Sequence, residues 1–211
     1  MHNRVEPDLA PVARLYGKAL EQHGQSAMAV GWRTEESQRL RFEKLLSVVD
    51  PRCGDRIDVN DLGCGYGALL SFLEERQVPI GTFFGYDISE EMLTVARKRA
   101  STAGSEFIAS SRVTQRADYS FASGIFNVKL DCDDRSWTSY VEDVIRNLAE
   151  QSRVGFAFNL LSTYSDYQEQ HLFYGDPLHW FDWCKRNVAP WVTLLHDYPL
   201  FEWTITVKVA G

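Results

Sequence analysis

The sequence predicts an α/β protein with a doubly wound, mostly parallel sheet, a C-terminal antiparallel hairpin strand and an N-terminal helical cap. From residue 57 onward, short apolar runs alternate with segments of helical period, which is the pattern of parallel strands joined by helices. Three glycines lie in the turn after the first of these strands. The end of the chain shows two apolar runs around a polar turn, which favours an antiparallel pair at the end of the sheet.

Residues 1–50 are expected to form the helical cap. Apolar residues recur at helical spacing across residues 9–22. A second helix is predicted over residues 34–49, because Thr34 is a favourable N-cap and two glutamates follow in the first turn, where negative charge complements the helix dipole. The connector at 27–32 is apolar and can fold over a ligand, so we expect the cap to take part in binding.

Residues 51–211 are expected to form the main domain, packed with the cap as one compact unit. Its alternating part has predicted strands at residues 57–62, 80–86, 105–110, 117–123 and 153–161. Helices are predicted between them at residues 67–76, 89–103 and 134–150. The tail is expected to add a helix at 175–187 and strands at 191–195 and 201–209.

Composition narrows the classes of function. The 211 residues suit one domain, and a net charge of −7 without a block of lysine and arginine predicts no nucleic-acid partner. No leader is visible and no apolar run is long enough to cross a bilayer, so we expect a cytoplasmic location without membrane association. The cysteines lack metal-ligand spacing, so no metal site is expected. The oligomeric state stays open.

The glycine-rich turn is the strongest functional signal in the chain. It reads Asp61-Leu62-Gly63-Cys64-Gly65-Tyr66-Gly67 between a buried strand and a helix. Alternate glycines let a ligand lie directly against the backbone, and the N–H groups at a helix start favour an anionic or polar ligand group. The turn therefore predicts a ligand-binding loop.

A second acidic residue follows at the end of the next predicted strand. Asp87 stands about twenty residues beyond the turn, at the position where a carboxylate holds a ribose diol in dinucleotide-type sheets. Gly63, Gly65 and Ala68 also satisfy the loose dinucleotide fingerprint. Asp61 immediately before the glycines argues against a pyrophosphate, because the two negative charges would repel each other. A nucleoside-bearing cofactor is predicted, and the turn favours one without a pyrophosphate.

These residues resemble the class I S-adenosylmethionine-dependent methyltransferases. Their acid-x-Gly-x-Gly-x-Gly motif is matched in full by residues 61–67, and their second acid is matched by Asp87. The resemblance covers about residues 57–209 and implies a Rossmann-like fold with S-adenosyl-L-methionine as cofactor. It implies that the turn, Cys64 included, holds the amino-acid end of that cofactor. Asp61 would then face the ammonium group and Asp87 the ribose.

The resemblance also marks looser positions along the predicted sheet edge. Ile88 and Met92 are expected beside the adenine, and Ser111 replaces the acid that the family often places against the adenine amino group. Ser123 and Gly124 end the fourth strand, where the family meets the cofactor through backbone atoms.

Three cap residues are further candidates for the cofactor site. Arg41 can bind a carboxylate with two parallel hydrogen bonds, and Trp32 can offer its ring to a sulfonium. Tyr16 belongs to the same segment. For Arg41 the alternative is a solvated helix face, because other basic residues lie nearby.

The implied activity is methyl transfer to an unidentified small molecule by in-line displacement. His196, His171 and Asn127 are weak candidates for catalysis or acceptor contact, and each can equally be structural. Two alternatives remain: a protein that binds S-adenosylmethionine without catalysis, and a nicotinamide-dependent oxidoreductase.

Overall fold

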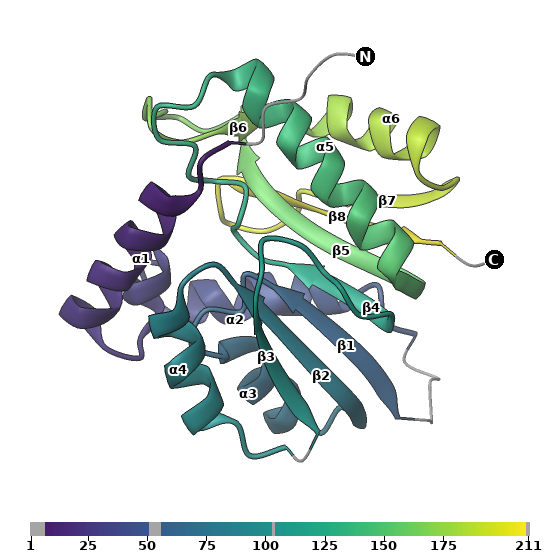
Figure 1. The fold of residues 1–211 in the computed structure, drawn as a ribbon. Helices are drawn as coiled ribbons and strands as arrows, with labels where there is room; N and C mark the ends of the chain where they lie inside the picture. Colours follow the sequence, from purple (N-terminus) through teal and green to yellow (C-terminus); the bar gives the residue numbers. More distant parts are fainter. Residues whose placement is uncertain (1–6, 51–55, 103, 210–211) are drawn as a thin grey trace.

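The computed structural model describes residues 7–50, 56–102 and 104–209. Its strands form one mixed sheet in the order β3-β2-β1-β4-β5-β8-β7, with β6 beside β5 (Figure 1). The strands are β1 (Ile57–Leu62), β2 (Ile80–Asp87), β3 (Ser105–Ala109), β4 (Ala117–Ala122), β5 (Ser152–Ser162), β6 (Tyr174–Gly175), β7 (Trp191–Leu195) and β8 (Glu202–Lys208). β8 is antiparallel to both β5 and β7, whereas the pairs from β3 to β5 are parallel. The predicted doubly wound sheet and its antiparallel end are confirmed.

The helices are α1 (Ala10–His23), η1 (Ala27–Val30), α2 (Glu35–Leu46), α3 (Ala68–Glu75), α4 (Glu90–Arg99), α5 (Asp134–Gln151) and α6 (Pro177–Asn187). Thr34 caps α2 as predicted, and Ser89 caps α4. The Thr34 Oγ1 accepts from the Ser37 N–H at 3.1 Å, and the Ser89 Oγ accepts from the Met92 N–H at 3.3 Å. The sequence predicts this helix over residues 89–103. In the structure α4 ends at Arg99, because the backbone becomes extended at Ala100.

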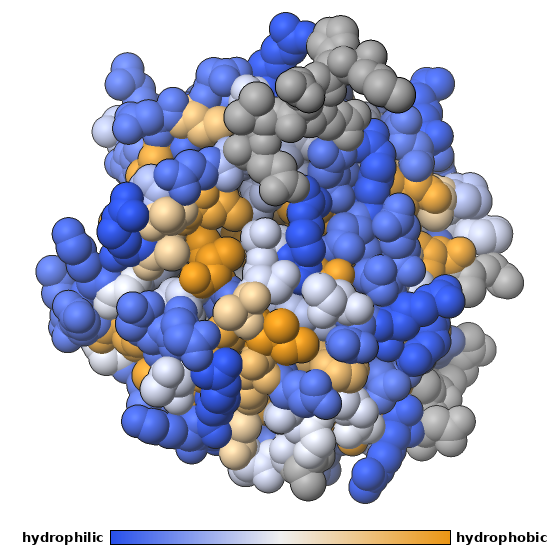
Figure 2. Space-filling model, in the orientation of Figure 1, coloured by the Kyte–Doolittle hydropathy of each residue, from blue (hydrophilic) through white to orange (hydrophobic). Residues whose placement is uncertain are grey.

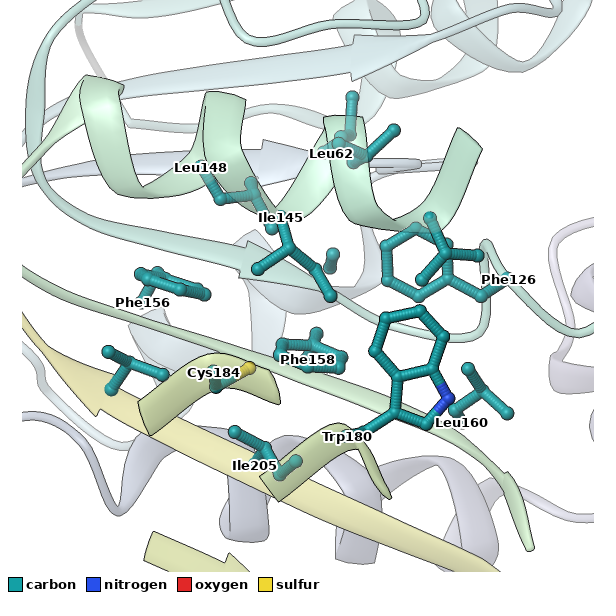
Figure 3. Close-up of a cluster of buried hydrophobic side chains, with 14 of the residues drawn as sticks. Leu62, Phe126, Ile145, Leu148, Phe156, Phe158, Leu160, Trp180, Cys184 and Ile205 are labelled. Carbon is teal, nitrogen blue, oxygen red and sulfur yellow. The ribbon is translucent and has the colours of Figure 1, made fainter. Parts of the chain in front are cut away.

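The two faces of the sheet carry separate cores. On one face, α2 and α3 pack with apolar residues of β1, β2 and β4. On the other face, α5 and α6 cover a core of aromatic and aliphatic side chains (Figure 3). Phe156, Phe158 and Leu160 of β5 point to Ile145 of α5 and Trp180 of α6 in that view. These cores fix the strand ends that carry the functional residues.

The predicted cap has two parts: α1 and η1 lie at the carboxyl ends of the central strands, whereas α2 covers one face of the sheet together with α3. α1 contacts α4 and η1, and α2 packs on β5 and β8 (Figure 1). The predicted boundary between residues 50 and 51 adjoins 51–55, which lie outside the described residues. Figure 2 shows that one side of the molecule is mostly hydrophilic, with apolar residues gathered near its centre. No helix in the described ranges is both long and apolar enough to cross a bilayer.

Candidate functional site

A cavity opens at the carboxyl ends of β1, β2 and β4, under the cap. Its empty volume, including the opening to solvent, is about 930 Å³, which is within the range of small-molecule sites. The wall combines the glycine turn, the strand ends, the cap and one face of α5. Its residues include Tyr16, Val30, Trp32, Gln38, Asp61, Gly63, Cys64, Gly65, Asp87, Ile88, Met92, Ser110, Ser111, Ser123, Gly124, Ile125, Trp137 and Tyr140.

Glycine is required in the turn for both conformation and space. Gly63 has φ 77°, and a Cβ there would lie 2.1 Å from the Ile125 Cγ2. Gly65 has φ 52°, and a Cβ there would lie 3.0 Å from the Val30 Cγ1. Gly67 has φ 83° and caps α3 but does not belong to the described cavity wall. The turn thus brings backbone atoms to the wall, as the sequence predicts.

Several N–H groups of the turn donate hydrogen bonds within the protein. The Gly63 and Cys64 N–H groups both donate to the Tyr86 carbonyl, at 2.7 and 2.9 Å. The Gly65 N–H donates to Asp87 and the Gly67 N–H to the Cys64 carbonyl, both at 2.9 Å. Folding the turn therefore occupies these four donors, and the expectation that backbone N–H groups meet a ligand carboxylate stays a prediction for the start of α3, at Ala68.

Asp61 is a buried carboxyl group in the cavity wall. The residue is 3% exposed, and no hydrogen bond links its carboxyl oxygens to the described residues. Burial, and then the negative charge of Asp87, raises its pKa to about 8. A buried carboxylate without a partner is costly, so a cationic ligand group at this point is strongly favoured.

Asp87 is held at the end of β2 by the backbone. Its Oδ2 accepts from the Gly65 N–H and its Oδ1 from the Ser89 N–H, each at 2.9 Å. Burial raises its pKa, while backbone hydrogen bonds from Ser89, Gly65 and Ile88 oppose that shift. Each carboxylate oxygen can accept more than one hydrogen bond, so both can also take a ligand hydroxyl.

The cap supplies aromatic side chains to the cavity. Burial, with the charge of Asp87, raises the pKa of Tyr16 to about 12, so its hydroxyl is neutral near pH 7. Trp32 lies over Gly124, where a Cβ would come within 2.4 Å of the ring. Gln38 also lines the cavity, and its Oε1 accepts from the Tyr66 hydroxyl at 3.2 Å.

The structure gives Arg41 a different role from the one predicted. Its Nε and Nη2 donate to the two carboxylate oxygens of Glu202, at 2.7 and 2.8 Å. Its guanidinium carbon lies 3.8 Å from the centroid of the Trp32 ring. Arg41 is buried behind Trp32 and is absent from the described cavity wall, so the predicted direct contact with a cofactor carboxylate is wrong. Both proposed alternatives, ligand contact and solvated face, miss this ion pair because its partner is 161 residues away.

The other residues predicted to contact the cofactor lie together in the cavity wall. Ile88, Met92, Ser111, Ser123 and Gly124 all line the cavity. Two aromatic residues of α5 that the sequence pattern does not single out, Trp137 and Tyr140, also line the cavity. Their spacing of three along an amphipathic helix was a usable signal, but it equally predicts core residues.

None of the three candidates for catalysis is among the residues of the described cavity wall. His171 is exposed, 3.6 Å from the Glu169 carboxylate. His196 is exposed beside the Tyr164 ring. Asn127 is buried, and its Oδ1 accepts from the Leu161 N–H at 3.1 Å, which joins the end of β4 to β5. The structure therefore gives Asn127 a structural role. Among the described residues, no group of three or more His, Cys, Asp or Glu could hold a metal ion.

Comparison with known proteins agrees with this geometry. A family model described as "Methyltransferase domain" matches residues 59–153. "Putative methyltransferase Rv1506c" of Mycobacterium tuberculosis is 45% identical over 160 residues, which are 74% of this chain and 96% of that protein. Nocamycin O-methyltransferase of Saccharothrix syringae is 41% identical over 85 residues, 40% of this chain and 29% of that protein.

Solved structures share the fold at low sequence identity. The magnesium protoporphyrin IX methyltransferase of Synechocystis PCC 6803 with bound S-adenosylmethionine has a TM-score of 0.65 and 12% identity, covering 99% of this chain and 100% of that one. The complex of DhpI with S-adenosylhomocysteine has a TM-score of 0.63 and 12% identity, covering 93% and 94%. The sheet order, the matched motif and the relative that spans most of the chain lead to one conclusion: the chain belongs to the class I S-adenosylmethionine-dependent methyltransferases.

Proposed function

We propose that this protein transfers the methyl group of S-adenosylmethionine to a small-molecule acceptor. The observation that carries the proposal is the buried Asp61 carboxyl group, which faces the cavity without a partner among the described residues. The ammonium group of S-adenosylmethionine is the cation that fits it. Asp87, at the end of β2, accepts a hydrogen bond from the Gly65 N–H and would hold the ribose hydroxyls.

The rest of the wall fits a nucleoside. Ile88 and Met92 offer apolar surface on one side, and Trp137 and Tyr140 of α5 face the same cavity. We assign the adenine to this region, with Ser111 as its polar neighbour. The Gly63–Gly65 backbone allows close approach of the methionine part, because a side chain at either position would fill that space.

When bound, the cofactor supplies an electrophilic methyl group on a positively charged sulfur. The chain's own residues orient it and exclude water. Correct alignment of two reactants can supply roughly 7–11 kcal/mol in favourable intramolecular comparisons. The cap residues Tyr16, Val30 and Trp32 cover the cavity and would limit the water around the reacting groups.

A small acceptor, rather than a macromolecule, is supported by several observations. Two named similarities, to nocamycin O-methyltransferase and to magnesium protoporphyrin IX methyltransferase, are to enzymes named for small molecules. The net charge of −7 disfavours nucleic acid, and we keep the expectation of a cytoplasmic location without a membrane partner.

Calorimetric titration tests the cofactor assignment. We expect S-adenosylmethionine and S-adenosylhomocysteine to bind the purified protein and NAD to show no heat of binding. Binding of NAD alone would favour the oxidoreductase and refute the proposal. Binding of S-adenosylmethionine, with no release of S-adenosylhomocysteine in the presence of any acceptor, would favour a catalytically silent protein instead.

A further inference from the structure

Trp32 lines the cavity at the end of β4, but no hydrogen bond of its own holds the ring there. The residue is half-buried, and its ring lies so close to Gly124 that a Cβ at that glycine would come within 2.4 Å of it. Trp32 belongs to the short connector between η1 and α2, and its indole N–H makes no hydrogen bond to the described residues. A connector backbone leaves a side chain several rotamers, so another contact must fix the ring.

Arg41 of α2 supplies that contact. Its guanidinium carbon lies 3.8 Å from the centroid of the Trp32 ring, which places the cation on one face of the indole. All three nitrogens of the guanidinium donate hydrogen bonds, Nη1 to the Ser37 carbonyl at 2.7 Å and the other two to Glu202. These bonds give the guanidinium a single orientation, and the ring packs against it.

Glu202 joins this stack to the sheet. It is the first residue of β8, and it pairs with Leu161 in the antiparallel ladder with β5. Arg41 and Glu202 are 7% and 1% exposed, and neither is among the residues of the described cavity wall. A buried ion pair is often no more stabilising than apolar residues of similar volume, because both charges lose their water. A fixed geometry, passed from the sheet through Arg41 to Trp32, is what the pair adds.

We propose that Arg41 and Glu202 are positioning residues, which hold the Trp32 ring as the wall that closes the cofactor cavity at Gly124. This inference rests on the proposed function. With the ring fixed, the cofactor is enclosed between the cap and the end of β4, and its release requires the ring to move away from Gly124. Without the pair the ring gains other rotamers, so a bound ligand leaves faster.

The double variant Arg41→Met/Glu202→Leu separates positioning from stability. It replaces the ion pair by apolar side chains, so the melting temperature should stay close to that of the parent. Release of labelled S-adenosylhomocysteine into an excess of unlabelled ligand should be about tenfold faster, with a weaker calorimetric affinity to match. Parent-like release and affinity in this variant would overturn the proposal, because the pair would then serve the fold alone.

Trp32→Leu tests whether the pair acts through the ring. The proposal requires that Trp32→Leu speeds release by itself, and that adding Arg41→Met/Glu202→Leu to it has little further effect. Additive effects of the two changes would overturn the proposal, because Arg41 and Glu202 would then influence the cofactor by another route.

Arg41→Lys covers failure of the double variant to fold. Lysine keeps a positive charge for Glu202 but lacks the flat guanidinium that donates two parallel bonds and lies on a ring. Release should again be faster than from the parent. In protein labelled with fluorotryptophan, the fluorine NMR signal of Trp32, identified by its loss in Trp32→Leu, should broaden or split. Parent-like release together with an unchanged signal would overturn the proposal.

Arg39 and Glu75 provide a matched control on the same helix. The Arg39 Nη1 donates to Glu75 at 2.6 Å, and its guanidinium lies 5.1 Å from the centroid of the Phe72 ring, but Phe72 is not among the residues of the described cavity wall. Arg39→Met/Glu75→Leu should release S-adenosylhomocysteine at the parent's rate. Release as fast as from Arg41→Met/Glu202→Leu would overturn the inference, since loss of any ion pair from α2 would then suffice. Failure of the parent to bind S-adenosylhomocysteine would instead overturn the proposed function.

Discussion

The first prediction concerns Asp61→Asn, which should stabilise the ligand-free protein at pH 7–8 and weaken its binding of S-adenosylmethionine. The asparagine has nearly the same shape but cannot ionise. Asp61 has a pKa of about 8 in the folded chain against an ordinary value of 3.8. Between these values the folded state binds more protons than the unfolded state, so stability falls as pH rises through this window and reaches its lowest level above about pH 8.

The size of the effect follows from the pKa. Each unit of pH within the window changes the free energy of unfolding by about 1.4 kcal/mol. From pH 6 to pH 8, the parent should therefore lose on the order of 2–3 kcal/mol relative to Asp61→Asn. For a domain of this size, that corresponds to a relative change in melting temperature of roughly 4–12 °C.

Thermal unfolding of both proteins without ligand, at pH 6, 7 and 8, measures this difference. Glu106→Gln, which removes an exposed acid from β3, controls for the change in net charge. Calorimetry at pH 7 should show that Asp61→Asn binds S-adenosylmethionine at least about tenfold more weakly, because the ammonium group loses its charged partner. Equal pH dependence in parent and variant would refute the buried, unpartnered state of Asp61.

Three further substitutions test other parts of the site. Asp87→Ala should weaken S-adenosylmethionine binding by about tenfold or more in calorimetry, with a far-UV circular dichroism spectrum like the parent's; unchanged affinity would contradict the ribose assignment. Gly124→Ala should lower the melting temperature and the cofactor affinity, because its φ is 74° and its new Cβ would meet the cap's indole ring, whereas Gly31→Ala (φ 81°, open space) should change only the melting temperature. Arg41→Met leaves Glu202 buried without its ion pair and should cost about 3–5 kcal/mol in urea unfolding, and adding Glu202→Leu should recover most of it; no recovery would mean that the pair is not the cause.

The sequence by itself was enough to predict the sheet, because hydrophobic periodicity and strand-to-helix turns are local properties. The run at residues 57–62, the glycines of the turn and the terminal strand at 191–195 all appear where the pattern places them. Asp61 and Asp87 could also be predicted from the sequence, because a motif fixes their spacing. Their positions at strand ends place them at the same edge of the sheet.

Only the tertiary structure shows which residues far apart in the sequence bind one another. Arg41 looked like a ligand-binding cation until Glu202, from the far end of the chain, was seen to pair with it. Likewise, the local sequence does not show that the Gly63, Cys64 and Gly65 N–H groups are occupied, because their acceptors belong to β2, the neighbouring strand. Local pattern determines which elements form, and long-range packing determines which of their side chains remain available for chemistry.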